Sequence, residues 1–382
     1  MKNPNLTFVT PSILTGDRSM SNVIWHEISH SWTGNLVTNK KWKNFWINEG
    51  FTIFMERKLS KILLGEEMSN LESIIGYNCL TYSIKLLGED SNFTSLSPDF
   101  SGIEPDDGFS NIPYEIVYRF LCYLEKKVGE NDFQQIMRNY IGEYKYESVD
   151  WTDLKKNYEH FVNDKYESKK ASQILNKIDW NRCITEKGYP RHIIKFKSYY
   201  IDEIDNLLNK FKNNEKKENS LTIFREWHTN VKTFFIAKIL NDNDIDNFDE
   251  NIILKLKKDL NLVDEFNDDI KEKWYEITLR KGMNIEIENI KNFLTICGRI
   301  KYLKLLYIAC IKHSFDDAKI FFDENKLIYH PIARKISHNI FDSKWIIYTK
   351  LPTTFKGKDT EKIITESLIK DLMLVQLMNA LI

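Results

Sequence analysis

The chain contains the sequence Trp25-His26-Glu27-Ile28-Ser29-His30, in which two histidines enclose a glutamate. Residues four apart lie on one face of an α-helix, so a helix here would direct both imidazoles toward one point. This spacing, with the glutamate beside it, is typical of a helical zinc site in which the glutamate acts on water. Catalytic zinc usually takes three protein ligands and keeps a fourth position open, so the third ligand must come from elsewhere.

The best candidate for that third ligand is Glu49, which lies in Trp46-Ile47-Asn48-Glu49-Gly50 near the start of the next predicted helix. A pattern with a glycine and a third histidine soon after the second histidine fails, because those positions hold Thr33 and Leu36. Glu56, two turns along the same helix face, is a candidate to bind one ligand imidazole. Two histidines at this spacing also occur by chance in structural helices, and Glu49 favours a metal site over that alternative.

Composition excludes several classes of function. The chain has 382 residues, with 54 lysines and arginines against 55 aspartates and glutamates, so no bulk charge favours nucleic acid or an anionic membrane. Its five cysteines are scattered, which argues against a disulfide framework and for a reducing compartment. No segment has the length of a membrane span or the apolar core of a signal peptide, so a cytoplasmic protein is expected.

Apolar residues recur at helical spacing along most of the chain, which predicts a mainly α protein. Residues 6–9 form a short run of β-forming side chains and are predicted to be a strand. Asp17 or Ser19 is expected to cap the helix with the two histidines, and residues 88–111 to form a long loop. The other predicted helices are 45–64, 69–87, 114–128, 131–141, 151–162, 200–211, 221–240, 252–260, 270–280, 287–297 and 302–312.

The two histidines and their flanks resemble the leukotriene A(4) hydrolase-like branch of the M1 zinc aminopeptidase family. The resemblance covers residues 22–39, together with 6–11 and 46–50, and it includes Ile112-Pro113-Tyr114-Glu115 and Asp179-Trp180-Asn181. It is specific up to about residue 181 and weak beyond. It implies a thermolysin-like (gluzincin) catalytic domain over residues 1–185, followed over residues 186–382 by an α-helical C-terminal domain of the HEAT or armadillo (ARM) type.

The resemblance also implies roles for individual residues. His26, His30 and Glu49 would hold one zinc ion (Zn²⁺) per chain, and Glu27 would be the general base for attack by zinc-activated water. Tyr114, by its Pro-Tyr-Glu context, would donate a hydrogen bond to the oxyanion. Zinc polarises a carbonyl, and a phenol across the site stabilises charge that appears only in the transition state.

The chain departs from the family at its start. The family carries a Gly-x-Met-Glu-Asn signature whose glutamate binds the substrate amine, whereas Met1 and Lys2 stand at this position. A lysine would repel an ammonium ion that a glutamate attracts, so weak aminopeptidase activity is expected. The family's N-terminal β-rich domain has no counterpart here, which suggests a fragment, a misplaced start or a degenerate copy.

Three further positions concern the substrate. Phe109 replaces a tyrosine of the leukotriene-type enzymes, which disfavours hydrolysis of a lipid epoxide, although Asp106 matches an aspartate tied to epoxide opening. Lys326 is the nearest substitute for the C-terminal residues that bind a substrate carboxylate, although a solvated surface lysine is the simpler interpretation.

The sequence therefore predicts a zinc metallopeptidase of the aminopeptidase type that acts on short peptides. It would share ancestry with enzymes that hydrolyse a lipid epoxide. Two alternatives stay open. A catalytically impaired zinc-binding fragment or scaffold is favoured by Lys2, and an endopeptidase would follow if no group captures the substrate amine. The sequence gives neither the preferred N-terminal residue of the substrate nor the oligomeric state.

Overall fold

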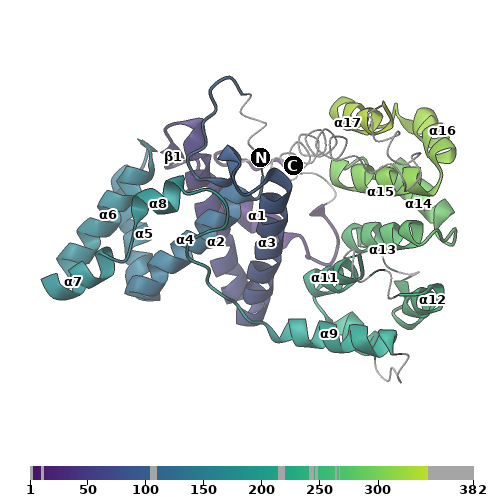
Figure 1. The fold of residues 1–382 in the computed structure, drawn as a ribbon, viewed down its shortest axis with the longest axis horizontal. Helices are drawn as coiled ribbons and strands as arrows, with labels where there is room; N and C mark the ends of the chain where they lie inside the picture. The colour runs from purple at the N-terminus through teal and green to yellow at the C-terminus, as the bar shows by residue number, and fades with distance from the viewer. Residues whose placement is uncertain are drawn as a thin grey trace. The chain divides into compact units, whose positions relative to one another are not determined.

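The computed structural model describes residues 3–9, 13–103, 110–213, 220–240, 245, 248–262, 265 and 267–342 (Figure 1). In this part of the chain, residues 3–9 and 21–198 form one compact unit, and residues 13–20 and those from 199 onward form a second. Both units are mainly α-helical, as the sequence predicts. The domain limits 1–185 and 186–382 stay a prediction.

Three helices form the centre of the first unit, and α1 (Ser21–Ser29) packs against one of them, α2 (Phe45–Leu64). The others are α3 (Glu66–Leu87) and α4 (Ile112–Val128). Helices α2 and α4 come unusually close at Gly50, where an added Cβ would lie 2.2 Å from Val117 Cβ. A side chain at this position would therefore push α4 away from the residue that follows Glu49.

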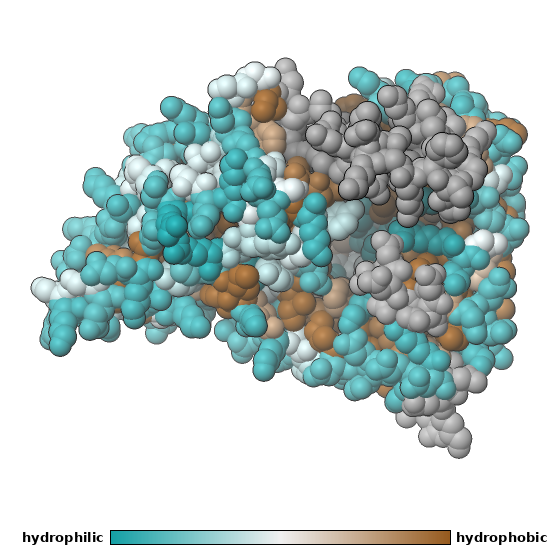
Figure 2. Space-filling model, viewed as in Figure 1, coloured by the Kyte–Doolittle hydropathy of each residue, from teal (hydrophilic) through white to brown (hydrophobic). Residues whose placement is uncertain are grey.

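Further helices pack on one side of this centre, beyond α4 (Figure 1). They are α5 (Glu130–Tyr144), α6 (Trp151–Lys165), α7 (Ser168–Leu175) and α8 (Trp180–Thr185), and the face of this region seen in Figure 2 is mostly hydrophilic. A short parallel pair joins β1 (Thr38–Asn39) to β2 (Ser148–Val149). The pair ties the segment after His30 to the start of α6, where Asp150 and Asp153 form a capping box.

The second unit is a stack of helices from α9 to α17. Helix α13 packs against both α11 and α15, and α15 packs against α17, so alternate helices form one layer (Figure 1). This arrangement is that of a helical solenoid, as the resemblance implies. The bounds are α9 (Tyr199–Lys212), α10 (Ser220–Glu226), α11 (Thr229–Leu240), α12 (Glu250–Asp259), α13 (Asp268–Arg280), α14 (Ile287–Ile296), α15 (Ile300–His313), α16 (Phe315–Asn325) and α17 (Pro331–Asp342).

Residues 13–20 belong to the second unit, although they directly precede α1. Asp17 anchors them, since its carboxylate accepts hydrogen bonds from Thr229 Oγ1 at 2.7 Å and from Asn267 Nδ2 at 3.1 Å. Burial raises the pKa of Asp17, but hydrogen bonds from Ser19, Thr15 and Thr229 outweigh it and hold the pKa well below its usual range. Helix α1 begins at Ser21, so neither Asp17 nor Ser19 occupies its cap position.

Two expectations about secondary structure are wrong. Residues 6–9 are irregular rather than a strand, and the Leu6 N–H donates to the Asn3 carbonyl at 3.3 Å across a turn. The helix expected over 221–240 is broken into α10 and α11, and Trp227, which lies between them, donates from Nε1 to Glu203 on α9 at 3.0 Å. The first unit also contains two short 3₁₀ helices, η2 (Trp42–Asn44) and η3 (Asn92–Thr94).

Candidate active site

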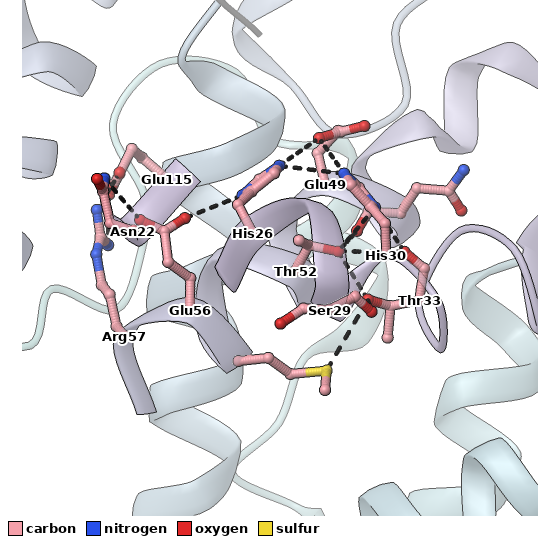
Figure 3. A network of polar contacts seen from close by, with 12 residues as sticks. Asn22, His26, Ser29, His30, Thr33, Glu49, Thr52, Glu56, Arg57 and Glu115 are labelled. Carbon is pink, nitrogen blue, oxygen red and sulfur yellow. Dashed lines mark hydrogen bonds and ion pairs between the residues drawn. The ribbon is translucent and has the colours of Figure 1, made fainter. Parts of the chain in front are cut away.

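The three predicted ligands meet in the first unit. His26, His30 and Glu49 are buried, and they form the cluster among the described residues that could hold a metal ion (Figure 3). The distances are 3.1 Å between the two Nε2 atoms, and 3.3 Å and 3.2 Å from Glu49 Oε2 to Nε2 of His26 and His30. A tetrahedral zinc ion with bonds of about 2.0–2.1 Å requires donor atoms about 3.3–3.4 Å apart. The donor set therefore fits zinc in both chemistry and spacing.

Local structure explains how the two histidines share a face. Helix α1 ends at Ser29, but the His30 N–H still donates to the His26 carbonyl at 3.1 Å, so the helical spacing extends to the second ligand. The chain then reverses through Gly34, whose φ of 139° is in the region that favours glycine. Glu49 lies in the first two turns of α2, which brings it opposite α1.

His26 is held from behind by a carboxylate. Its Nδ1 lies 2.9 Å from Glu56 Oε2, as the sequence predicts for Glu56, and Asn22 Nδ2 donates to the other oxygen of Glu56 at 3.4 Å. Burial lowers the pKa of His26, but the hydrogen bonds and charges of Glu49 and Glu56 outweigh it and raise the pKa to about 10. A metal ion bound at Nε2 would displace the proton that this raised pKa keeps on the imidazole.

The two predicted catalytic residues lie at the same place. Glu27 follows His26 on α1 and is buried, with 6% of its surface exposed. Tyr114 is in the first turn of α4, and its ring centroid is 6.5 Å from that of His26. Burial, together with the nearby carboxylates of Glu49 and Glu27, raises the pKa of Tyr114 well above its usual value. The buried Tyr114 hydroxyl makes no hydrogen bond of ordinary geometry with the described residues.

A buried ion pair fixes the start of α4 against α2. Arg57, which follows Glu56, donates both guanidinium branches to Glu115, which follows Tyr114, with 3.0 Å between Nη1 and Oε2 (Figure 3). Gly76 on α3 makes room for the pair, since an added Cβ would lie 2.3 Å from both Arg57 Nη2 and Glu115 Oε1. Such a bidentate pair sets the geometry of the two helices as well as their attraction.

An aromatic cavity lies beside these residues. It has a volume of about 30 Å³, and its walls include Trp42, Phe45, Phe93, Phe100 and Pro113. The Phe45 ring is 6.2 Å from the Tyr114 ring, so the cavity is adjacent to the predicted oxyanion donor. Lys43 and Ser95 also line it.

The structure does not test the remaining predicted residues at this site. Met1, Lys2, Asp106 and Phe109 lie outside the described residues, so their predicted roles stay predictions. Lys326 lies in the second unit at the end of α16, where its Nζ is 2.9 Å from Asp323 Oδ1.

The sequence analysis did not identify Thr52, whose buried hydroxyl lies 3.0 Å from His30 Nδ1. The available signal was its position one turn after Glu49, on the same face of the helix.

Comparison with protein families finds two matches along the chain. Residues 1–180 match the peptidase family M1 domain, and residues 227–341 match the C-terminal domain of leukotriene A4 hydrolase. Leucine aminopeptidase 2 of Yarrowia lipolytica is 32% identical over 346 residues, which are 87% of this chain and 53% of that protein. A leukotriene A-4 hydrolase homolog of Botryotinia fuckeliana is 32% identical over 336 residues, which are 87% of this chain and 51% of that protein.

Solved structures give the same result. The structure of yeast leukotriene A4 hydrolase in complex with bestatin matches with a TM-score of 0.78 and 26% sequence identity, over 89% of this chain and 57% of that one. The native enzyme from Saccharomyces cerevisiae matches with the same TM-score at 25% identity, over 90% of this chain. The chain spans about half the length of the curated relatives that it matches.

Proposed function

The chain belongs to the M1 peptidase family, and from this membership and the geometry of its site we propose that it is a zinc-dependent aminopeptidase of short peptides. The observation that carries the proposal is the triangle of donor atoms from His26, His30 and Glu49, with edges of 3.1 to 3.3 Å. These edges fit one zinc ion with a fourth position open to substrate. The leucine aminopeptidase relatives support a peptide as the substrate.

The residues around the triangle have distinct roles in this proposal. A bound zinc ion would polarise the scissile carbonyl and make water more acidic. Glu27, beside His26, accepts the proton of the attacking water and passes it to the leaving amine. Tyr114 donates a hydrogen bond to the oxygen that becomes negative, because its buried phenol lies beside His26 and close to the Glu49 carboxylate. The high pKa of Tyr114 keeps this proton on the phenol at neutral pH.

The aromatic cavity next to Tyr114 supports a substrate with an apolar side chain. Its walls are mostly aromatic or apolar, so they would contact an apolar group of the substrate away from water. Hydrolysis of a lipid epoxide stays a prediction from ancestry, since Asp106 and Phe109 lie outside the described residues. A cytoplasmic location stays a prediction too, and none of the described helices has the length and apolar character needed to cross a bilayer.

The test measures zinc content and cleavage separately. The purified chain should bind about one zinc ion, and His30→Ala should abolish tight binding, since each lost ligand removes a metal bond. The zinc-loaded parent should release a leucyl or alanyl reporter amine from a free N-terminus. Unchanged zinc affinity in His30→Ala would contradict the site itself.

Other outcomes point to the alternatives. Tight zinc binding without cleavage would contradict the enzyme and support a zinc-binding scaffold. Cleavage of internal bonds in N-terminally blocked peptides would support an endopeptidase instead. Lys2→Glu, compared with the parent at equal zinc content, tests whether the lysine weakens capture of the substrate amine, in which case it should raise the rate.

A further inference from the structure

Thr52 is fully buried against the His30 imidazole (Figure 3). Its Oγ1 lies 3.0 Å from His30 Nδ1, 2.7 Å from Thr33 Oγ1 and 2.8 Å from the carbonyl oxygen of Asn48. His30 Nδ1 is also 2.9 Å from the carbonyl oxygen of Thr33. The Nδ1 atom of the second histidine ligand is thus surrounded by oxygens of uncharged groups.

The chemistry of these groups fixes where each proton lies. A hydroxyl has one proton to donate and two lone pairs to accept with, whereas a carbonyl oxygen can only accept. The Thr52 proton is drawn to a carbonyl, either that of Asn48 at 2.8 Å or that of Thr33 at 3.1 Å. The lone pairs of Thr52 Oγ1 then accept from the Thr33 hydroxyl and from His30 Nδ1.

This direction of donation determines the tautomer of His30. A neutral imidazole carries a proton on one ring nitrogen only. Both neighbours of Nδ1, the Thr33 carbonyl and the Thr52 hydroxyl oxygen, are satisfied by a proton at Nδ1. The lone pair is therefore on Nε2, which lies 3.1 Å from His26 Nε2 and 3.2 Å from Glu49 Oε2 at the proposed metal position.

We propose that Thr52 is a positioning residue that, beside the Thr33 carbonyl, orients the His30 imidazole as the Nδ1–H tautomer, with Nε2 directed at the metal position. The inference rests on the proposed zinc site and deepens it. Glu49, Thr52 and Glu56 are spaced at i, i+3 and i+7 along one face of α2. This face supplies the third ligand and also the groups behind both histidines, so α2 organises all three ligands together.

The two histidines are thereby held by different chemistry. Behind His26 is the Glu56 carboxylate, which brings a negative charge, whereas behind His30 are the neutral oxygens of Thr52 and Thr33. Removal of the Thr52 hydroxyl therefore changes the orientation of a ligand without changing the charge of the site. Partners of this kind typically contribute about 10- to 100-fold to metal affinity.

The test uses Thr52→Val, which keeps the shape of the side chain and removes the hydroxyl, and Thr52→Ser, which keeps the hydroxyl. Thr278→Val in α13 is the matched control, because Thr278 is fully buried and its Oγ1 donates to a helix carbonyl, that of Tyr275, at 2.9 Å. Zinc affinity is measured by competition with a chromophoric chelator. Thr52→Val should bind zinc about 10- to 100-fold more weakly, whereas Thr52→Ser and Thr278→Val should stay within about threefold of the parent.

A second measurement does not depend on a bound metal. Nitrogen-15 NMR of the metal-free protein, labelled at histidine, should show the proton of His30 on Nδ1, and Thr52→Val should shift the Nδ1 signal while the Thr33 carbonyl at 2.9 Å keeps the proton there. Parent-like zinc affinity in Thr52→Val, or equal losses in the valine and serine variants, would overturn the inference. His30→Ala, measured in parallel, separates failure of the Thr52 inference from failure of the zinc site. Unchanged zinc affinity in His30→Ala would contradict the zinc site altogether.

Discussion

Glu56 Oε2 lies 2.9 Å from His26 Nδ1, across the contact between α2 and α1. The carboxylate is itself held by Asn22 from one turn earlier on α1, and neighbouring Arg57 is bound to Glu115 (Figure 3). The orientation of the first histidine ligand is therefore connected to the start of α4, where Tyr114 lies. Loss of the Glu56–His26 contact and loss of the Arg57–Glu115 ion pair should therefore affect different steps of the proposed reaction.

Glu56→Gln should weaken zinc binding about tenfold, because the amide keeps a hydrogen bond to His26 but no longer increases the basicity of the imidazole. Chelator competition at constant pH measures the change. Glu143→Gln on α5 is the control, since its side chain contacts Asn157 and lies outside the site. Equal affinities in the parent and Glu56→Gln would show that Glu56 does not tune the ligand.

Glu27→Gln should keep one zinc ion per chain and lose peptide hydrolysis, on the order of 10²- to 10⁴-fold, because an amide cannot accept the proton of water. The measurement pairs metal analysis with release of a leucyl reporter. Turnover at the parent rate would mean that another group is the base.

Tyr114→Phe should separate activity from stability. Turnover should fall about 10²- to 10³-fold with little change in KM, since the donor acts on charge in the transition state. The thermal midpoint should not fall, because the deleted hydroxyl makes no hydrogen bond of ordinary geometry with the described residues. In the control Tyr158→Phe, the lost bond to the Leu124 carbonyl at 3.1 Å should cost about 0.5–1.5 kcal/mol of stability and leave turnover intact. The reverse pattern would make Tyr114 a packing residue.

Arg57→Met should destabilise the first unit by about 3–5 kcal/mol, because it leaves the buried Glu115 carboxylate without its partner. The double variant Arg57→Met, Glu115→Leu should recover most of this loss, since neither charge then remains buried. Urea unfolding measures both. As a control, Glu159→Gln, which opens the exposed pair with Lys155, should change stability by at most about 1 kcal/mol. A double variant no more stable than Arg57→Met would contradict the ion-pair account.

Asp17→Asn should destabilise the second unit in a pH-dependent way. The folded state lowers the pKa of Asp17, so its ionised form contributes stability that is fully present above the unfolded pKa near 3.8. That contribution is lost as the pH falls toward the folded pKa. The difference in thermal midpoint between parent and variant should therefore be constant from pH 6 to about 4.5 and shrink in more acidic buffer. A constant difference at pH 3 would contradict this origin.

The sequence predicts which side chains come together at the candidate metal site, because their arrangement depends on local spacing. His26 and His30 are four residues apart, and Glu49 and Glu56 are seven apart, so helix geometry alone determines which side chains share a face. Spacing alone does not predict that α1 and α2 meet. That expectation came from the resemblance of the flanking residues. The structure agrees with both.

The sequence could not predict features that depend on partners far along the chain. A threonine in a helix commonly bonds to the carbonyl four residues earlier, so nothing in the residue type marked Thr52 as a contact of His30. Helical periodicity continues through residues 221–240, so it does not mark the break at Trp227, whose indole bonds to Glu203 on another helix. Residues 6–9 have strand-forming side chains, but propensity alone does not supply the neighbouring strand that a sheet requires.

The anchoring of Asp17 has a consequence for biosynthesis. The segment that leads into α1 is made early, whereas its partners Thr229 and Asn267 follow 212 and 250 residues later. At about 5–20 residues per second, the ribosome needs roughly 12–50 s to add the intervening chain. During this interval the first unit can already fold, whereas residues 13–20 do not yet have their partners from the second unit. A nascent chain stalled before Asn267 emerges should therefore have residues 13–20 open to proteases, and the completed chain should protect them.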